Sequence, residues 1–258
     1  MTLTSTAPTA RTSTTIRSRR LRVLALVATA PAQAVTVTAS GPGINGANLA
    51  AQATFDISGD VLTISLTNTA DDDEQNDTDN QDVPGNTLTG LFFDFLDNPT
   101  LTKDTATITA GSLLQDGTCT GLCDGTTTNV GGEFGFATSW TGGPSAGYGI
   151  SSSGYIGGSG TLFDATANLD DPASPDGINF GIISRLGVYD PNGGLAGDPV
   201  IQDTVTFTFT GATGLSVDNI SNVSFQYGTD FDEPNVVPVP AAVRLRPVWS
   251  GWHSPPQA

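Results

Sequence analysis

The chain has 258 residues and a formal net charge of −17, from 26 acidic and 9 basic residues. Such an acidic chain repels the phosphate backbone of nucleic acids and anionic lipid surfaces, which excludes nucleic acid as a partner. Its 31 glycines and 16 prolines are typical of a protein rich in turns, and its single histidine leaves little for histidine-based catalysis.

The amino-terminal residues have the pattern of a secretory signal peptide. Five arginines precede an apolar run at residues 23–30 that is too short to span a bilayer. Ala32-Gln33-Ala34 then supplies the small-x-small cleavage pattern. We expect residues 1–34 to be removed and the protein to be exported. The alternative is an amphipathic helix buried in the fold.

Removal of this segment and of the carboxyl-terminal residues 244–258 makes the protein more acidic. Residues 35–243 keep two basic residues, Lys103 and Arg185, beside all 26 acidic ones, a net charge of −24. This charge suits a soluble extracellular protein or one that meets cations. Residues 35–235 are enough for one well-buried β domain.

Alternation of apolar and polar residues predicts β-strands throughout this domain. The clearest runs are residues 62–66, 205–209 and 223–227, each with one apolar face and one polar face. Further strands are expected at 35–39, 51–58, 88–95, 105–110, 133–138, 148–152 and 179–184. Gly59-Asp60 has the composition of a tight hairpin turn.

Short strands of this kind predict an all-β fold. With about ten strands between loops rich in glycine, aspartate and proline, we expect an antiparallel β-sandwich of jelly-roll type. A parallel β-helix is the alternative, but the sequence has no short fixed repeat.

An acidic run at residues 71–82 holds seven carboxylates in twelve positions. Oxygen donors of this kind suit Ca²⁺, and the candidate ligands are Asp71, Asp73, Asp77, Asp79 and Asp82. Compared with an EF-hand loop, Asn76 replaces the required glycine and Asp82 the bidentate glutamate. We therefore expect a solvated loop that associates weakly with calcium, and no other cofactor.

The two cysteines, Cys119 and Cys123, lie close together in the sequence. In an oxidising compartment we expect them to form a local disulfide. So short a loop restricts the unfolded chain only slightly, so its stabilising effect should be modest.

Few residues of the exported domain suit catalysis. The histidine, His253, lies in the carboxyl-terminal tail, so serine or cysteine nucleophiles would lack a histidine partner. A pair of carboxylates, as in glycosidases, would arise by chance among so many acidic residues. We expect no enzymatic activity.

Three aromatic residues offer an alternative function. Trp140, Tyr148 and Tyr155 lie in a glycine- and serine-rich segment, where exposed rings could stack on sugars. We prefer the interpretation that they pack in the core.

The most informative motif is Val-Val-Pro-Val-Pro-Ala-Ala-Val at residues 236–243. Its prolines lack a backbone donor and favour extended neighbours, so residues 237–240 should form a stiff, extended linker. A frayed terminus is the alternative. The motif resembles the start of the sorting tail of exosortase-dependent (PEP-CTERM) bacterial surface proteins, carried here by Val237, Pro238, Val239, Pro240, Ala241 and Ala242.

The residues after this motif depart from the family pattern, in which an apolar helix and a short arginine run follow. Residues 244–258 are too few to span a bilayer, contain Arg244 and Arg246, and are broken by three prolines. A one-nucleotide shift of the codons permits a Gly-Leu-Val-Gly-Ile-Ala-Arg-Arg-Arg type of ending. We interpret residues 236–258 as a sorting signal altered by a frameshift, with no stable membrane span.

Four blocks, at residues 90–94, 149–154, 174–182 and 220–229, are similar to one group of exosortase-dependent surface proteins. The resemblance implies export and sorting to the surface or matrix of an exopolysaccharide-producing Gram-negative bacterium. It implies no catalytic residues. We expect a non-enzymatic surface or biofilm-matrix protein whose partners are the sorting machinery and exopolysaccharide. A carbohydrate-binding module of the same matrix is the alternative.

Overall fold

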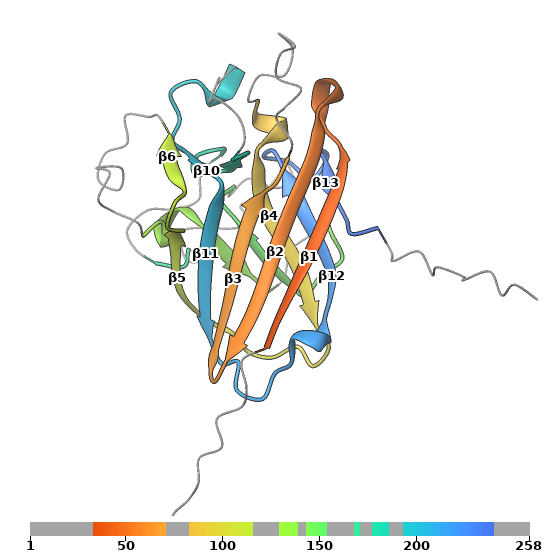
Figure 1. Ribbon diagram of the computed structural model, residues 1–258, viewed down its shortest axis with the longest axis vertical. Helices are drawn as coiled ribbons and strands as arrows, with labels where there is room; N and C mark the ends of the chain where they lie inside the picture. The colour runs from red at the N-terminus through yellow and green to blue at the C-terminus, as the bar shows by residue number, and fades with distance from the viewer. Residues whose placement is uncertain are drawn as a thin grey trace, which may run out of the picture.

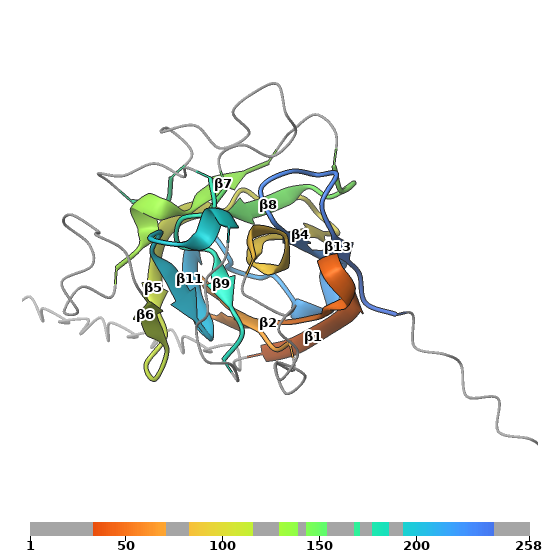
Figure 2. The ribbon, with the colours of Figure 1, turned by 90° about the horizontal axis from the view of Figure 1, so that it is seen from above.

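The computed structural model describes residues 33–70, 83–115, 129–138, 143–153, 168–170, 177–185 and 193–239. These residues form two β-sheets that face each other (Figure 1, Figure 2). The all-β sandwich predicted from the sequence is confirmed. The finer expectation, a jelly-roll connection of the strands, stays a prediction.

The first sheet has five strands, which lie in front in Figure 1. Their order is β1 (Gln33–Pro42), β2 (Asn48–Ser58), β3 (Val61–Asn68), β11 (Thr204–Thr210) and β5 (Thr102–Ile108).

The second sheet has eight strands and branches at β4 (Leu88–Phe95). One path contains β13 (Asn235–Val236), β12 (Ile220–Tyr227), β4, β9 (Ile182–Ile183), β10 (Val200–Gln202) and β6 (Leu113–Gln115). Along the branch, β8 (Tyr148–Ser151) pairs with β4, and β7 (Gly135–Ala137) pairs with β8. The pair β9 and β10 is parallel, whereas the other paired strands are antiparallel.

Buried and outward-facing residues alternate along the strands of the first sheet, as the sequence predicts. Phe55, Ile64 and Phe207 lie in register on neighbouring strands and are fully buried. The next residues along these strands point outward and are mostly threonine, whose β-branch fits the pleated backbone. At the end of β2, Ser58 pairs with Val61, so Gly59-Asp60 forms the predicted two-residue hairpin turn.

An aromatic cluster fills the space between the sheets. Phe93 lies at its centre, with ring centroids 5.3 Å from Phe55 and 5.4 Å from Tyr148. Phe136 of β7 continues the cluster to Phe209 of β11, at a centroid distance of 4.8 Å. Because these rings come from both sheets, the cluster fixes one sheet against the other.

Some strand boundaries differ from the sequence-based prediction. The strand expected at 179–184 contracts to the two residues of β9, because residues 177–180 form turns and Phe180 has a positive φ of 59°. Glu133, expected in a strand, lies in the 3-10 turn η3 (Gly131–Glu133), so β7 begins at Gly135. The short strands β6, β10 and β13 were not predicted.

Four further 3-10 turns lie in the connections: η1 (Ile44–Gly46), η2 (Pro84–Asn86), η4 (Gly193–Leu195) and η5 (Val217–Asn219). Within the described residues, no helix has the length and apolar character needed to cross a membrane.

Candidate functional site

The candidate site is the carboxyl-terminal part of the described residues, where β12 and β13 lead into the Val-Pro segment at residues 237–239. β12 leads into a turn at residues 228–234, and β13 then returns to pair with β12 through Phe225 and Gln226. This region contains most of the block at 220–229 that carries the family resemblance. Its geometry therefore decides how the downstream segment leaves the fold.

The buried side chain of Gln226 stabilises this turn through hydrogen bonds to its backbone. Its side chain is fully buried, and its Nε2 lies 2.8 Å from the carbonyl oxygens of both Tyr227 and Asp230. Longer contacts from Nε2 reach the carbonyl oxygens of Glu233 and Pro234, at 3.3 and 3.4 Å. Its Oε1 accepts a hydrogen bond of 3.0 Å from the Asn235 side chain. One buried amide thus bonds several backbone carbonyls of the turn, in addition to the backbone bonds from Glu233 N to Asp230 O and from Tyr227 N to Pro234 O.

Glu233 closes the same turn from its other end. Its carboxylate accepts hydrogen bonds from the backbone N–H groups of Thr229 and Asp230, the second at 2.9 Å. Gly228 has a φ of 72°, and a Cβ at this position would lie only 2.2 Å from the Glu233 carboxylate. A glycine is therefore needed here for both backbone conformation and space.

Contacts with β4 tie the turn to the second sheet. Thr89 donates its hydroxyl to the carbonyl oxygen of Gly228 at 2.5 Å, and Gly228 N donates to the Thr87 carbonyl at 2.9 Å. Phe231 packs on Phe92, with ring centroids 5.8 Å apart. These contacts fix the position from which β13 starts.

Burial of the described chain changes after Val236, which is the last buried residue before the exposed Val237. Val236 is buried, and its Cγ1 lies 2.9 Å from the position of a Cβ on Gly41 of β1, so a side chain there would collide with it. Val237 is 57% exposed and Val239 is 77% exposed. Residues 237–239 are neither strand nor helix, and this last described segment points away from both sheets (Figure 1).

The prediction places six residues in the sorting motif, and the structure describes the first half of them. Val237 and Val239 are exposed in the described segment, and Pro238 between them is partly buried. Pro240, Ala241 and Ala242 lie outside the described residues. The structure thus brings the start of the motif to the surface, directly after the last strand.

The expected signal-peptide cleavage site lies at the start of the first strand. Ala34 is the second residue of β1 and pairs with Asp56, whereas Ala32 lies outside the described residues. Gln33 begins β1, and its Oε1 accepts a hydrogen bond of 3.1 Å from the Ser216 hydroxyl. Cleavage after Ala34 would remove two of the ten residues of β1.

Tyr148 packs in the core, as we expected in preference to a sugar-binding role. It is 3% exposed and stacks on Phe93 and Phe136. Its hydroxyl donates to the carbonyl oxygen of Pro99 at 2.5 Å. Burial, with a smaller effect of the Asp94 charge, raises the pKa of Tyr148. Trp140 and Tyr155 lie outside the described residues.

Two other predicted sites fall outside the described residues. They are the calcium candidates Asp71, Asp73, Asp77, Asp79 and Asp82, and the cysteines Cys119 and Cys123. Within the described part of the chain, no group of three His, Cys, Asp or Glu side chains is placed to hold a metal ion.

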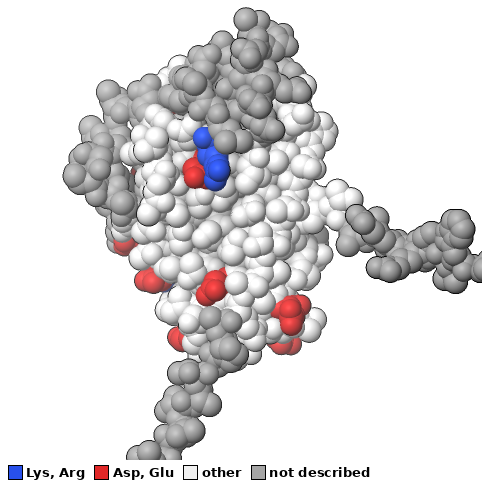
Figure 3. Space-filling model, viewed as in Figure 1, with Lys and Arg blue, Asp and Glu red and all other residues white. Residues whose placement is uncertain are grey.

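The outer face of the first sheet carries ordered rows of hydroxyl groups. One row crosses all five strands in register and consists of Thr36, Thr54, Ser65, Thr206 and Thr107. Neighbouring hydroxyls bond across strands, as in Thr67–Thr204 and Thr105–Thr208, both at 2.8 Å. Figure 3 shows few charged side chains on this face, most of them toward its lower end. The face is thus polar without being strongly charged.

Sequence reasoning did not single out Gln226 or Glu233. The available signal was the position of Gln226 in the block at 220–229, followed by a glycine at 228. No family model matches the chain, and no match is found among curated proteins or solved structures.

Proposed function

We propose that this chain is a non-enzymatic, secreted cell-surface or extracellular-matrix protein of an exopolysaccharide-producing Gram-negative bacterium. Its amino-terminal signal directs export, and its carboxyl-terminal motif, in the intact form, directs sorting by an exosortase system. The observation that carries this proposal is the position of the motif. Among the described residues the last buried one is Val236, and the Val-Pro motif starts at the next residue, the exposed Val237.

This arrangement supports a sorting role because a processing enzyme must reach its signal in a folded substrate. The bonds of Gln226 and Glu233 hold the chain immediately before the motif, so the motif starts from a fixed point. Pro238 and Pro240 have no backbone N–H, so they oppose further pairing of the tail with β12. Both features favour an extended segment that an enzyme can bind.

The alternative function is a carbohydrate-binding module of the same matrix. The hydroxyl-rich face of the first sheet, which has few charged side chains, and the groove described below favour it, since neutral polysaccharides are recognised through hydroxyl and amide groups. A matrix protein can also combine the two roles.

The experiment compares two forms of the protein in a host that carries an exosortase. A form that is made to end at residue 258 should reach the culture medium unprocessed at its carboxyl end, because residues 244–258 offer no apolar span. A form with the reading frame restored should be retained and trimmed. A form that stops after Val239 controls for release without any tail. If all three forms fractionate alike, the sorting proposal is wrong.

A further inference from the structure

A groove of about 560 Å³ opens at the side of the sandwich, between the edge strand β1 and the strands β12 and β13. Its size is within the range of small-molecule sites. Its walls come from elements far apart in the sequence: Val37 of β1, residues 220–224 of β12, and the first residues of the sorting motif. The groove therefore exists only in the folded domain with its carboxyl-terminal linker in place.

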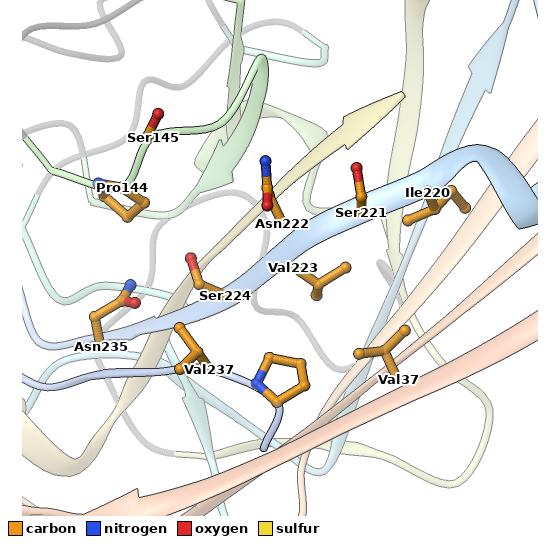
Figure 4. Close-up of a pocket in the computed structure, with 11 residues that line it drawn as sticks. Val37, Pro144, Ser145, Ile220, Ser221, Asn222, Val223, Ser224, Asn235 and Val237 are labelled. Carbon is orange, nitrogen blue, oxygen red and sulfur yellow. The ribbon is translucent and has the colours of Figure 1, made fainter. Parts of the chain in front are cut away.

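One wall of the groove is apolar. Figure 4 shows Val223 on the side of β12 that faces Val37, with Val237 nearby. Pro238 also belongs to the lining. These side chains offer aliphatic surface, the kind that packs against the C–H groups of a sugar ring.

The other wall carries hydroxyl and amide groups. Figure 4 shows Asn222 and Ser224 on the side of β12 where Pro144 and Ser145 lie. The side-chain nitrogen of Asn222 donates to Asp94 and that of Asn235 to Gln226, and each amide also has an oxygen that can accept a hydrogen bond. None of the described lining residues is charged, although the chain carries 26 acidic side chains.

Ser224 gives independent evidence for a ligand. It is only 4% exposed, and its hydroxyl finds no hydrogen-bond partner among the described residues. Buried hydroxyl groups are nearly always bonded, so an unpartnered one requires an explanation. A hydrogen bond from the Ser224 hydroxyl to a bound ligand, directly or through one water molecule, explains why this hydroxyl has no partner in the described part of the chain.

We propose that this groove binds a neutral saccharide unit of a polysaccharide. Sugar hydroxyls donate to and accept from the same groups that line the polar wall, while the sugar ring packs on the valines. Acidic sugars are disfavoured, because Asp94 lies behind Asn222 and the chain is strongly negative. The choice of a polysaccharide rests on the matrix role proposed above, whereas binding in the groove can be tested without it.

Affinity electrophoresis of the full chain tests this site, with dextran and galactomannan as neutral polysaccharides and alginate as the acidic one. We expect at least one neutral polysaccharide to retard the protein and alginate to have no effect. Ser224→Ala should raise the Kd roughly tenfold, which corresponds to about 1.4 kcal/mol. Ser152→Ala is the matched control, because Ser152 is also buried and unpartnered among the described residues but lies outside the groove lining.

A second matched pair protects the test against folding defects. Val237→Ala should weaken retardation, and Val239→Ala should not, because both side chains are exposed but only Val237 lines the groove. The melting temperature of all four variants should stay near that of the parent protein.

Any one of three results would overturn the proposal. The first is that neither neutral polysaccharide retards the protein, and the second is that the two substitutions of each matched pair change retardation equally. The third is that the protein binds a synthetic peptide of residues 240–258 and no glycan. If the parent protein binds no neutral polysaccharide while the three tail forms fractionate as expected, this site is refuted and the sorting proposal stands. If the parent protein binds a neutral polysaccharide through the groove while the three tail forms fractionate alike, the sorting proposal is refuted and this site stands.

Discussion

The two sheets of this sandwich bury their strands in different ways. In β11 of the first sheet, Phe207 is fully buried and its neighbour Thr206 is partly exposed on the outer face. In β4 of the second sheet, the neighbours Phe92 and Phe93 are both fully buried, although they point to opposite faces. The first sheet thus has one buried face, and the centre of the second has two.

The covering of the second face comes from the end of the domain. Phe231 packs on Phe92, and a Cβ on Gly143 would lie within 2.5 Å of the Phe231 ring. The turn that carries Phe231 is the one held by Gln226 and Glu233. The segment at residues 228–236, directly before the Val-Pro residues, therefore contributes to the core.

The largest expected effect tests this difference directly. Phe92→Ala and Phe93→Ala should each lower the free energy of unfolding by about 3–5 kcal/mol, as for other buried phenylalanines. In β11, Phe207→Ala should cost the same, but Thr206→Ala only about 0.2–1 kcal/mol, for the loss of cross-strand contacts. Urea unfolding measures all four variants. A Phe92→Ala variant as stable as Thr206→Ala would show that the second face of β4 is not a core.

The same difference explains what the sequence could and could not predict. In the first sheet, one face of each strand meets water, so the polar–apolar period of two is visible and β2, β3 and β11 were located well. In β4 the residues Leu88–Phe93 are all buried, so no polar–apolar period appears there, but the length and aromatic content of the run still predicted a strand. The two-residue strands β9 and β13 are too short for any period to appear.

The candidate site was predictable only in part. The Val-Pro-Val-Pro motif is local in sequence, so its position and exposure followed from the prolines. The turn before it depends on bonds from the side chain of Gln226 to backbone carbonyls at residues 227–234. The groove needs Val37 and Val237, which are brought together only by folding. Neither feature has a periodic pattern in the sequence.

The next effect concerns the turn itself. Gln226→Ala should lower the free energy of unfolding by about 2–3 kcal/mol, because it removes the buried side-chain hydrogen bonds from Nε2 to the turn and from the Asn235 side chain to Oε1. Gln52→Ala, on the outer face of the first sheet, is the control and should change stability by less than about 0.5 kcal/mol. Hydrogen exchange at residues 228–236 should accelerate in the first variant only. Equal exchange in both variants would contradict the role given to Gln226.

A smaller effect compares two glycines with positive φ. A Cβ on Gly59, in the hairpin of the first sheet, would meet no atom within 4 Å, whereas one on Gly228 would collide with the Glu233 carboxylate. Gly59→Ala should therefore cost only the backbone strain, about 1 kcal/mol. Gly228→Ala should cost about 2 kcal/mol, since it also displaces the bonds of Glu233. Thermal unfolding of the two variants measures the difference, and a larger loss at Gly59 would reverse the comparison.

The smallest effect is a change in ionisation at the hairpin of the first sheet. The Asp60 carboxylate accepts hydrogen bonds from the Thr213 hydroxyl at 2.6 Å and from Thr213 N at 3.2 Å. These bonds, chiefly that of the hydroxyl, together with one from the Gly211 backbone, lower the pKa of Asp60. Thr213→Val removes the main cause, so the pKa of Asp60 should rise toward its ordinary value.

The sign of the pH dependence follows from this lowered pKa. The carboxylate stabilises the fold fully at pH values above the ordinary pKa of an aspartate, and this contribution is lost as the pH falls through the lower pKa of the folded state. Thr213→Val should therefore be less stable than the parent protein near neutral pH, and the difference should vanish in acid. An NMR titration of the Asp60 carboxyl carbon measures the pKa, with Thr36→Val as a control far from Asp60 in the sheet. An unchanged Asp60 titration in Thr213→Val would show that this hydrogen bond does not hold the hairpin to the connection after β11.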